Sequence, residues 1–268
     1  MSAKHAITEA MATIDDAESA ARFIEWFAEH WLSPLGEGDG CPAEEITAAE
    51  HRLGLQLPNT LTSCYRLLGR RRDLTSRQDR LLRPDQLRLD EDVLVFRVEN
   101  QHCAIWGIRV SQLAQPDPPV VFRELTRDGR TPWRPFLECL SLAAVEMVLS
   151  EALLSAEPDD DVSDNRELNE EILHGIEEHF ERLPFPDYPL WADPDGPPVR
   201  WFAGTDLILR DDARQWLWVR SRTTAQLGTF RAAFPGDWIM HPDGHPQESL
   251  LDIHRGINLS CPEFRRVR

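Results

Sequence analysis

The sequence predicts an α+β fold, in which helices and mainly antiparallel strands occupy separate stretches of the chain and the N-terminus forms a helical extension. Its 268 residues are 41% hydrophobic and 28% charged, which is typical of a globular protein with a sizeable core. Apolar residues recur at helical spacing in several segments. Between these segments lie pairs of short runs rich in Val, Ile, Phe and Trp, which are joined closely enough to form hairpins.

Residues 1–40 predict an amphipathic helix followed by a linker. Within residues 14–31, one face of the helix carries Ala17, Ala21, Ile24, Ala28 and Trp31. Two aspartates precede this face, where carboxylates stabilise the positive end of the helix dipole. The segment Ser33–Pro42 contains two prolines and three glycines, which indicates a linker.

Residues 42–69 predict two short helices. Gly54 ends the first of them, and Asn59 is a potential cap for the second. The basic segment 70–92 shows no clear periodicity and is expected to be a surface loop with short helical pieces. No aromatic residue interleaves its arginines, so the segment does not favour RNA binding.

A polar cluster separates the two strands expected at Val93–Val98 and Cys103–Val110. It comprises Glu99, Asn100, Gln101 and His102. These side chains could form an active site or a turn. Short polar side chains bond to the nearby backbone in turns, and Asn tolerates the left-handed backbone region, so the turn is favoured.

The next segments predict an edge strand and a central helix. Pro118 and Pro119 precede the strand "VVFRE", as is usual for a strand at the edge of a sheet. Apolar residues nearly surround the helix expected at residues 136–154, which should therefore lie at the centre of the core. Glu146 and Glu151 interrupt this segment, so it is not a membrane span.

The remainder of the chain predicts an acidic linker at residues 156–167, an extension at residues 168–240 and a polar tail at residues 241–268. In the extension, a helix with apolar residues every fourth position is followed by the strands "VRWFAGTDLILRDD" and "RQWLWVRSRTT". An acidic turn is expected between these strands, at Asp211 and Asp212. A last short helix is expected near residues 225–233.

The charge of the chain, formally −17, is unevenly distributed. Residues 151–200 contain 15 acids and 3 arginines, whereas residues 51–90 contain 9 arginines and 4 acids. A surface this acidic repels the phosphates of nucleic acids and membranes and attracts basic proteins. The sequence therefore predicts a protein partner, with neither nucleic acid nor membrane as a ligand, although acidity could also serve only to keep the chain in solution. The candidate contact residues are Asp159, Asp160, Asp161 and Asp164.

No motif for a nucleophile, a phosphate loop or a zinc protease occurs, so the sequence predicts no catalytic residues, no cofactor and no metal. His174 and His179 lie on one expected helix, but five residues of spacing turn them about 140° apart. A single cluster offers four potential metal ligands, namely His241, His245, Asp252 and His254. This cluster leaves a metal-dependent hydrolase as an alternative.

The five cysteines form no C-x-x-C pair, which argues against both a disulfide framework and a zinc knuckle. Buried reduced thiols fit a cytoplasmic protein. The N-terminus has no apolar core of the kind found in signal peptides, so no leader is expected. The sequence therefore predicts a cytoplasmic location.

Several segments, taken in order, resemble the SUKH superfamily, which contains bacterial toxin-immunity proteins and a fungal regulator of cell-wall glucan synthesis. Its motif E-E-x-I-x-x-x-E-x-x-L-G-x-x-L-P corresponds here to Glu44, Glu45, Ile46, Glu50, Leu53, Gly54, Leu57 and Pro58. The run "ENQ", followed by Trp106 and Gly107, looks like an actinobacterial branch. The resemblance covers residues 41–154 and extends less securely to Trp238. It implies a curved, mainly antiparallel sheet flanked by helices, no catalytic residues, and partners that are often secreted nucleases or deaminases.

These features together predict a non-catalytic protein-binding module, with an immunity protein that neutralises a basic toxin domain as the leading hypothesis. The expected organisation is an extension at residues 1–40 and a SUKH-like domain at residues 41–240, whose core covers residues 41–155. A regulatory scaffold that binds an endogenous enzyme or a cell-wall complex is the alternative. The oligomeric state is not predicted.

Overall fold

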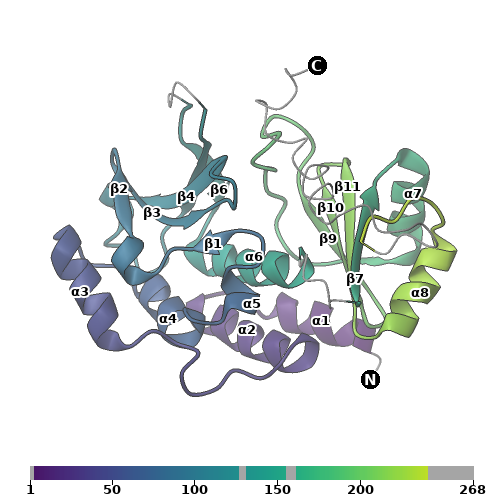
Figure 1. The fold of residues 1–268 in the computed structure, drawn as a ribbon, viewed down its shortest axis with the longest axis horizontal. Helices are drawn as coiled ribbons and strands as arrows, with labels where there is room; N and C mark the ends of the chain where they lie inside the picture. Colours follow the sequence, from purple (N-terminus) through teal and green to yellow (C-terminus); the bar gives the residue numbers. More distant parts are fainter. Residues whose placement is uncertain (1–2, 127–130, 155–160, 241–268) are drawn as a thin grey trace. The chain divides into compact units, whose positions relative to one another are not determined.

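The computed structural model describes residues 3–126, 131–154 and 161–240 (Figure 1). It confirms the α+β fold, because the described residues form eight α-helices and two antiparallel sheets. After the first four residues, the chain divides into two compact units, His5–Ala156 (unit 1) and Glu157–Arg268 (unit 2). Each unit contains one sheet and its own helices.

Unit 1 begins with the helices α1 (Ala3–Ala12), α2 (Ala17–Trp31), α3 (Ala43–Leu53) and α4 (Asn59–Leu68). The sequence predicted a single helix before the linker, whereas the structure adds α1, whose Ile7 and Met11 are buried. A capping box starts α2, because Asp16 and Ser19 each accept a hydrogen bond from the other's backbone N–H, at 2.8 and 2.9 Å. Gly54 ends α3 in the left-handed conformation, with φ of 66°.

The sheet of unit 1 contains β1 (Arg80–Leu81), β2 (Arg88–Asp90), β3 (Val93–Val98), β4 (Ala104–Arg109), β5 (Val120–Glu124) and β6 (Arg134–Leu137). Its order is β1-β3-β4-β5-β6, and β2 also pairs with β3. Two expectations are corrected here. The basic segment contains a short helix, α5 (Arg72–Thr75), in agreement with the short helical pieces predicted, but it also supplies two strands, β1 and β2. The strand β5 is an interior strand, because it pairs with both β4 and β6.

Helix α6 (Leu140–Leu153) forms the centre of unit 1, as the sequence predicted. Every one of its residues but Leu142 is buried. Helices α2, α4 and α5 contact it, and Figure 1 shows this layer of helices beneath the sheet. Two short 3₁₀ turns, Pro84–Gln86 and Val110–Gln112, complete the unit.

A β-bulge sets the direction of the Arg97 side chain. Val95 is opposite Gly107 of β4, but Arg97 is opposite Trp106, so Phe96 is an extra residue in β3. Partners in an antiparallel pair share a face of the sheet, and adjacent residues point to opposite faces. The bulge therefore turns Arg97 onto the face of Trp106, where its guanidinium lies 4.9 Å from the ring centroid.

The elements of unit 2 are β7 (Ser163–Glu167), α7 (Glu170–His179), β8 (Glu181–Arg182), β9 (Arg200–Gly204), β10 (Leu207–Asp212), β11 (Trp216–Ser221) and α8 (Thr224–Ala233). The sheet order is β7-β11-β10-β9-β8. Residues 163–167, expected to belong to a linker, therefore form an edge strand. The extension contains four further strands, where the sequence predicted two.

The acidic turn that the sequence predicted in unit 2 is also corrected. Asp211 and Asp212 belong to β10 and pair with Leu217 and Trp216 of β11. The turn is made by the next two residues, Ala213 and Arg214, whose φ angles are 53° and 59°. Positive φ at both central positions matches the twist of the two strands and closes a tight hairpin.

Helices α7 and α8 pack on one face of the unit 2 sheet. The core between them contains Leu168, Ile172, Leu173, Ile176, Phe202, Leu207, Leu209, Leu217, Val219, Leu227, Phe230 and Trp238. Asn169 caps α7 by accepting a hydrogen bond from the backbone N–H of Ile172 at 2.9 Å. Among the described residues of both units, no helix combines the length and the apolar character needed to cross a bilayer.

The close approach of β3 and β4 requires a glycine at position 107. A Cβ atom there would lie 2.6 Å from the backbone oxygen of Leu94. We expect Gly107→Ala to lower the free energy of unfolding by about 1–3 kcal/mol, because the strands must separate. Gly36→Ala is the matched control, since no atom lies within 4 Å of its Cβ position. Denaturant titration of both variants measures the difference, and equal midpoints would contradict the prediction.

Candidate functional site

Two of the four predicted contact residues can be placed in the structure, and they differ in exposure. Asp161 is exposed, and its Oδ2 accepts a hydrogen bond from the hydroxyl of Thr224 at 2.8 Å. Asp159 and Asp160 lie outside the described residues. Of the described pair, only Asp161 is accessible to a partner.

Asp164 is buried and corrects the prediction that it contacts a partner. Its exposed fraction is 1%. Its Oδ1 accepts hydrogen bonds from the backbone N–H groups of Asn165, at 2.8 Å, and Met240, at 2.9 Å, and Arg231 lies 3.5 Å from Oδ2. This carboxylate thus fixes the segment after Trp238 against the edge strand β7, where the backbone oxygen of Asn165 also accepts from Ile239.

The polar cluster between β3 and β4 is a turn, as the sequence favoured. The Glu99 carboxylate accepts hydrogen bonds from the backbone N–H groups of Gln101 and Cys103, at 2.8 and 2.9 Å. His102, and not Asn100, takes the left-handed conformation, with φ of 62°. Glu99 is buried and bonded to its own turn, so its role is to shape the hairpin.

The histidines of α7 do not form a metal site. Both His174 and His179 are exposed, and His179 hydrogen-bonds through Nδ1 to the backbone oxygen of Gly175. Within the described ranges, no group of three or more His, Cys, Asp or Glu side chains could hold a metal ion, and four cysteines are free thiols. The candidate ligands His241, His245, Asp252 and His254 lie outside these ranges.

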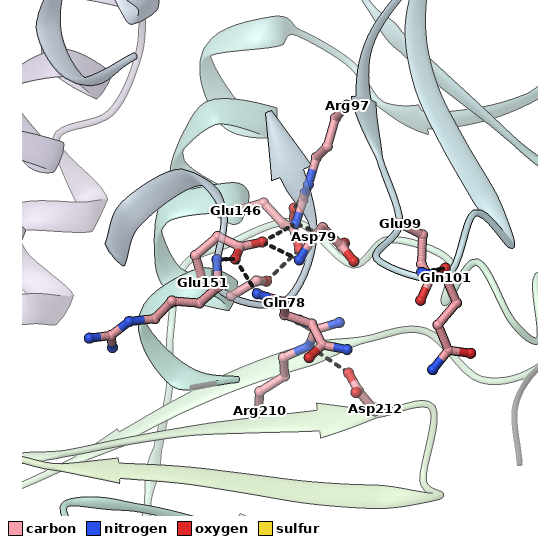
Figure 2. Close-up of polar contacts among 11 residues, drawn as sticks. Gln78, Asp79, Arg97, Glu99, Gln101, Glu146, Glu151, Arg210 and Asp212 are labelled. Atoms are coloured by element: carbon pink, nitrogen blue, oxygen red, sulfur yellow. Dashed lines mark hydrogen bonds and ion pairs between the residues drawn. The ribbon is translucent and has the colours of Figure 1, made fainter. Parts of the chain in front are cut away.

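Unit 1 contains a buried group of charges that we call the ionic cluster: Asp79, Arg97, Glu146 and Glu151 (Figure 2). Arg97 comes from β3, Asp79 from the segment before β1, and the two glutamates from α6. The Arg97 guanidinium contacts Glu146 through Nη1 at 2.7 Å. Its Nη2 lies 3.1 Å from Asp79 and 3.2 Å from Glu151. One guanidinium therefore joins three elements that are distant in the sequence.

Glu151 also holds the backbone of the segment before β1. Its Oε2 accepts hydrogen bonds from the N–H groups of Arg77 and Gln78, at 2.6 and 2.7 Å, and its Oε1 accepts from that of Asp79 at 2.9 Å. Three consecutive N–H donors converge on one carboxylate, as Figure 2 shows in part. Hydrogen bonds to an ionised acceptor are about twice as strong as neutral ones, so this contact is the main anchor of residues 77–79.

Each carboxylate oxygen of Glu146 has a hydrogen-bond partner. Its Oε2 faces Arg97, and its Oε1 accepts a hydrogen bond from the Ser150 hydroxyl at 2.6 Å. Ser150 lies four residues later on α6, so the two side chains share a face of the helix. Asp79 is held less firmly than either glutamate, because the Arg97 nitrogen that it contacts is shared with Glu151, and Glu151 and Glu146 have further hydrogen-bond donors.

The ionic cluster has more carboxylates than cations. If all four side chains were ionised, two negative charges would remain uncompensated in the interior. Loss of hydration raises the pKa of Asp79 to about 8, although the charge of Arg97 opposes this shift. The neighbouring carboxylates that raise it further are those of Glu151, Glu99 and Glu146. Asp79 therefore holds a proton at neutral pH.

Burial also affects Glu151 and Arg97. Burial raises the pKa of Glu151 above its usual value, and Arg97 and the three backbone N–H donors offset only part of this shift. Burial alone would lower the pKa of Arg97. The surrounding carboxylates outweigh burial and raise this pKa above its usual value, so the guanidinium keeps its charge. The guanidinium supplies the positive charge among these three carboxylates, and the chemistry that the cluster can perform is the binding and release of a proton.

The sequence contained a signal for the ionic cluster. Glu146 and Glu151 interrupt an otherwise apolar helix, and Arg97 interrupts the strand "VLVFRV". A charge in a segment that must be buried needs an opposite charge nearby. The two glutamates served above only to exclude a membrane span, and they were not paired with Arg97.

We expect Asp79→Asn to flatten the dependence of stability on pH. In the native protein Asp79 holds its proton up to pH of about 8, whereas in the unfolded chain it loses the proton near 3.8. Between these values the native state binds more protons, so the free energy of unfolding decreases as pH rises. Asn cannot ionise and lacks this contribution. Denaturant titrations of both proteins from pH 5 to 9 measure the difference, and parallel curves would contradict the prediction.

Replacement of Arg97 should lower the free energy of unfolding more than replacement of a surface arginine. Arg97→Met leaves buried carboxylates without their counter-charge, and we expect a loss of about 3–5 kcal/mol in the free energy of unfolding. Arg88→Met, at an exposed position on β2, is the control and should change it by less than about 0.5 kcal/mol. Similar losses in both variants would show that Arg97 does not act through the cluster.

The described residues thus contain two kinds of charged group. In unit 1 the ionic cluster is internal, and its members are engaged with one another and with the backbone. In unit 2 carboxylates such as that of Asp161 are exposed to solvent. Comparison with protein-family models, with curated proteins and with solved structures finds no match for this chain.

Proposed function

We propose that this chain is a SUKH-like, non-catalytic protein-binding module, and that it is an immunity protein which neutralises a basic toxin domain in the cytoplasm. The observation that carries the proposal is the charge of α7. Its exposed face bears Glu170, Glu171, Glu177 and Glu178. At 3.6 residues per turn, these four side chains fall within roughly a third of the helix circumference.

Most of this charge is available to a partner. Glu177 pairs with Arg200 at 2.8 Å, but none of the described cations pairs with Glu170, Glu171 or Glu178. The opposite face of α7, with Ile172, Leu173 and Ile176, is buried in the core of unit 2. The helix is therefore fixed by its apolar face while it presents its carboxylates to solvent.

An acidic face of this kind is suited to rapid capture of a basic protein. Long-range attraction raises association rates by about 10- to 1,000-fold at low salt, and it acts before any contact is formed. An interface of ordinary size, roughly 1,600 Å² in total, would suffice for a stable complex. Occlusion of a toxin needs no chemistry from the immunity protein, which fits the structural use of the buried carboxylates in unit 1.

Protection of living cells tests the proposal. We expect a toxin domain to be encoded beside the gene of this chain. The chain is co-expressed with that domain, and growth of the bacterial host is compared with and without the chain. We expect growth to be restored and the two proteins to elute together in size-exclusion chromatography. Continued killing, with no complex formed by the purified proteins, would overturn the proposal.

The contribution of α7 can be measured with charge-matched variants. We expect Glu170→Gln, Glu171→Gln and Glu178→Gln, combined, to slow association with that toxin domain by about tenfold at low salt and to weaken its salt dependence. The control combines Glu25→Gln, Glu29→Gln and Glu44→Gln, which remove the same charge from exposed positions of α2 and α3. Stopped-flow kinetics at several salt concentrations distinguishes them. If both triple variants slowed association equally, net charge and not α7 would be responsible.

A further inference from the structure

We propose that residues 76–79 of unit 1 form a proton-controlled latch, which is closed on helix α6 while Asp79 carries a proton and opens when that proton is lost. The latch lies between α5 and β1, and both of these elements are fixed independently. Leu74 of α5 is fully buried, and Leu81 of β1 pairs with Arg97 of β3. The segment between them can therefore move while its ends stay in place.

The closed state depends on one carboxylate. Glu151 accepts the three backbone hydrogen bonds from Arg77, Gln78 and Asp79. Figure 2 shows the side chains of Glu151 and Asp79 converging on Arg97. The backbone N–H groups of the latch and the guanidinium of Arg97 thus bind the same carboxylate, that of Glu151. The protonation state of Asp79 determines how stable both contacts are.

Asp79 is the member of the ionic cluster that can exchange a proton with solvent. Its side chain is 10% exposed, compared with 3% for Glu146 and 0% for Glu151. It also has the fewest donors, because the Arg97 Nη2 group that it contacts is shared with Glu151. The charged groups that face it are Arg97 from β3, Glu99 from the following turn, and Glu146 and Glu151 from α6.

Loss of the Asp79 proton destabilises the closed latch. The new negative charge lies beside Glu151, because both carboxylates contact the same nitrogen of Arg97. Repulsion between two neighbouring carboxylates in a protein interior is large compared with the contribution of a single backbone hydrogen bond. Movement of Asp79 into water relieves the repulsion, and because its own N–H is bonded to Glu151, this movement pulls the backbone of the latch away from α6. The Asp79 pKa of about 8 places the transition slightly above neutral pH.

Hydrogen exchange of individual amides tests the latch. Protection factors, corrected for the intrinsic effect of pH, are measured for the N–H groups of Arg77, Gln78 and Asp79 at pH 6.5 and 9. We expect their protection to fall by about tenfold at pH 9, one unit above the pKa, because each unit changes the ratio of ionised to protonated Asp79 tenfold. The N–H of Leu94 in the centre of β3 should keep its protection, which separates local opening from unfolding.

Two variants show whether Asp79 is responsible. In Asp79→Asn the latch amides should stay protected at both pH values. In Glu99→Gln, loss of a neighbouring negative charge should shift the opening to lower pH. The proposal is overturned if the native protein keeps full protection at pH 9, or if Asp79→Asn loses protection as the native protein does. Trypsin cleavage after Arg77, normalised to a peptide substrate at each pH, gives a second measure should Asp79→Asn fold poorly.

Discussion

The fold of unit 1 depends on the guanidinium of Arg97 and the carboxylates that surround it. These contacts join β3, helix α6 and the segment before β1. In the sequence, Arg97 is 49 residues from Glu146 and 54 residues from Glu151. Buried charges of this kind are costly to desolvate and contribute little net stability, but they permit few alternative arrangements. Glu146 and Glu151 both reach Arg97 only when α6 has its observed position, so their contacts favour a single register of the helix. The β-bulge at Phe96 serves the same end, because without it Arg97 would point to the other face of the sheet.

Local patterns predicted most of the helices and the first hairpin. Helices α2, α3, α6 and α7 follow from apolar spacing, and Gly54 ends α3 as predicted because only a residue without Cβ takes its left-handed conformation at no cost. The β3–β4 turn likewise depends on neighbours within a few residues. Helix α1 was missed, since its short and weakly apolar sequence gains stability only when Ile7 and Met11 are buried by the rest of the protein.

The errors arose where charge was taken as a sign of exposure. Asp164, Asp211 and Asp212 were assigned to a linker and a turn, yet all three are buried in strands. Their partners explain this: Asp211 accepts hydrogen bonds from Arg200 of β9, and Arg210 pairs with Asp212. The first pair joins two strands whose register the sequence does not reveal, and the second lies within β10. A composition rich in Asp and Arg is therefore compatible with either a solvated loop or a paired strand. The ionic cluster was missed for a different reason: its helix was expected to be buried, but Glu146 and Glu151 were not paired with Arg97.

Burial also determines what each charge can contribute to function. An exposed carboxylate of α7 interacts with distant charges through water, so its influence falls off over about 10 Å at 0.1 M salt. The ionic cluster lies within the protein, where salt screens it weakly. Its contribution to stability therefore depends on pH more than on salt concentration. The net charge of −17 therefore combines two separate properties of the chain. The exposed part can steer a basic partner in a salt-dependent manner, while the buried part sets the stability of unit 1 through pH and leaves association kinetics unaffected as long as the fold is intact.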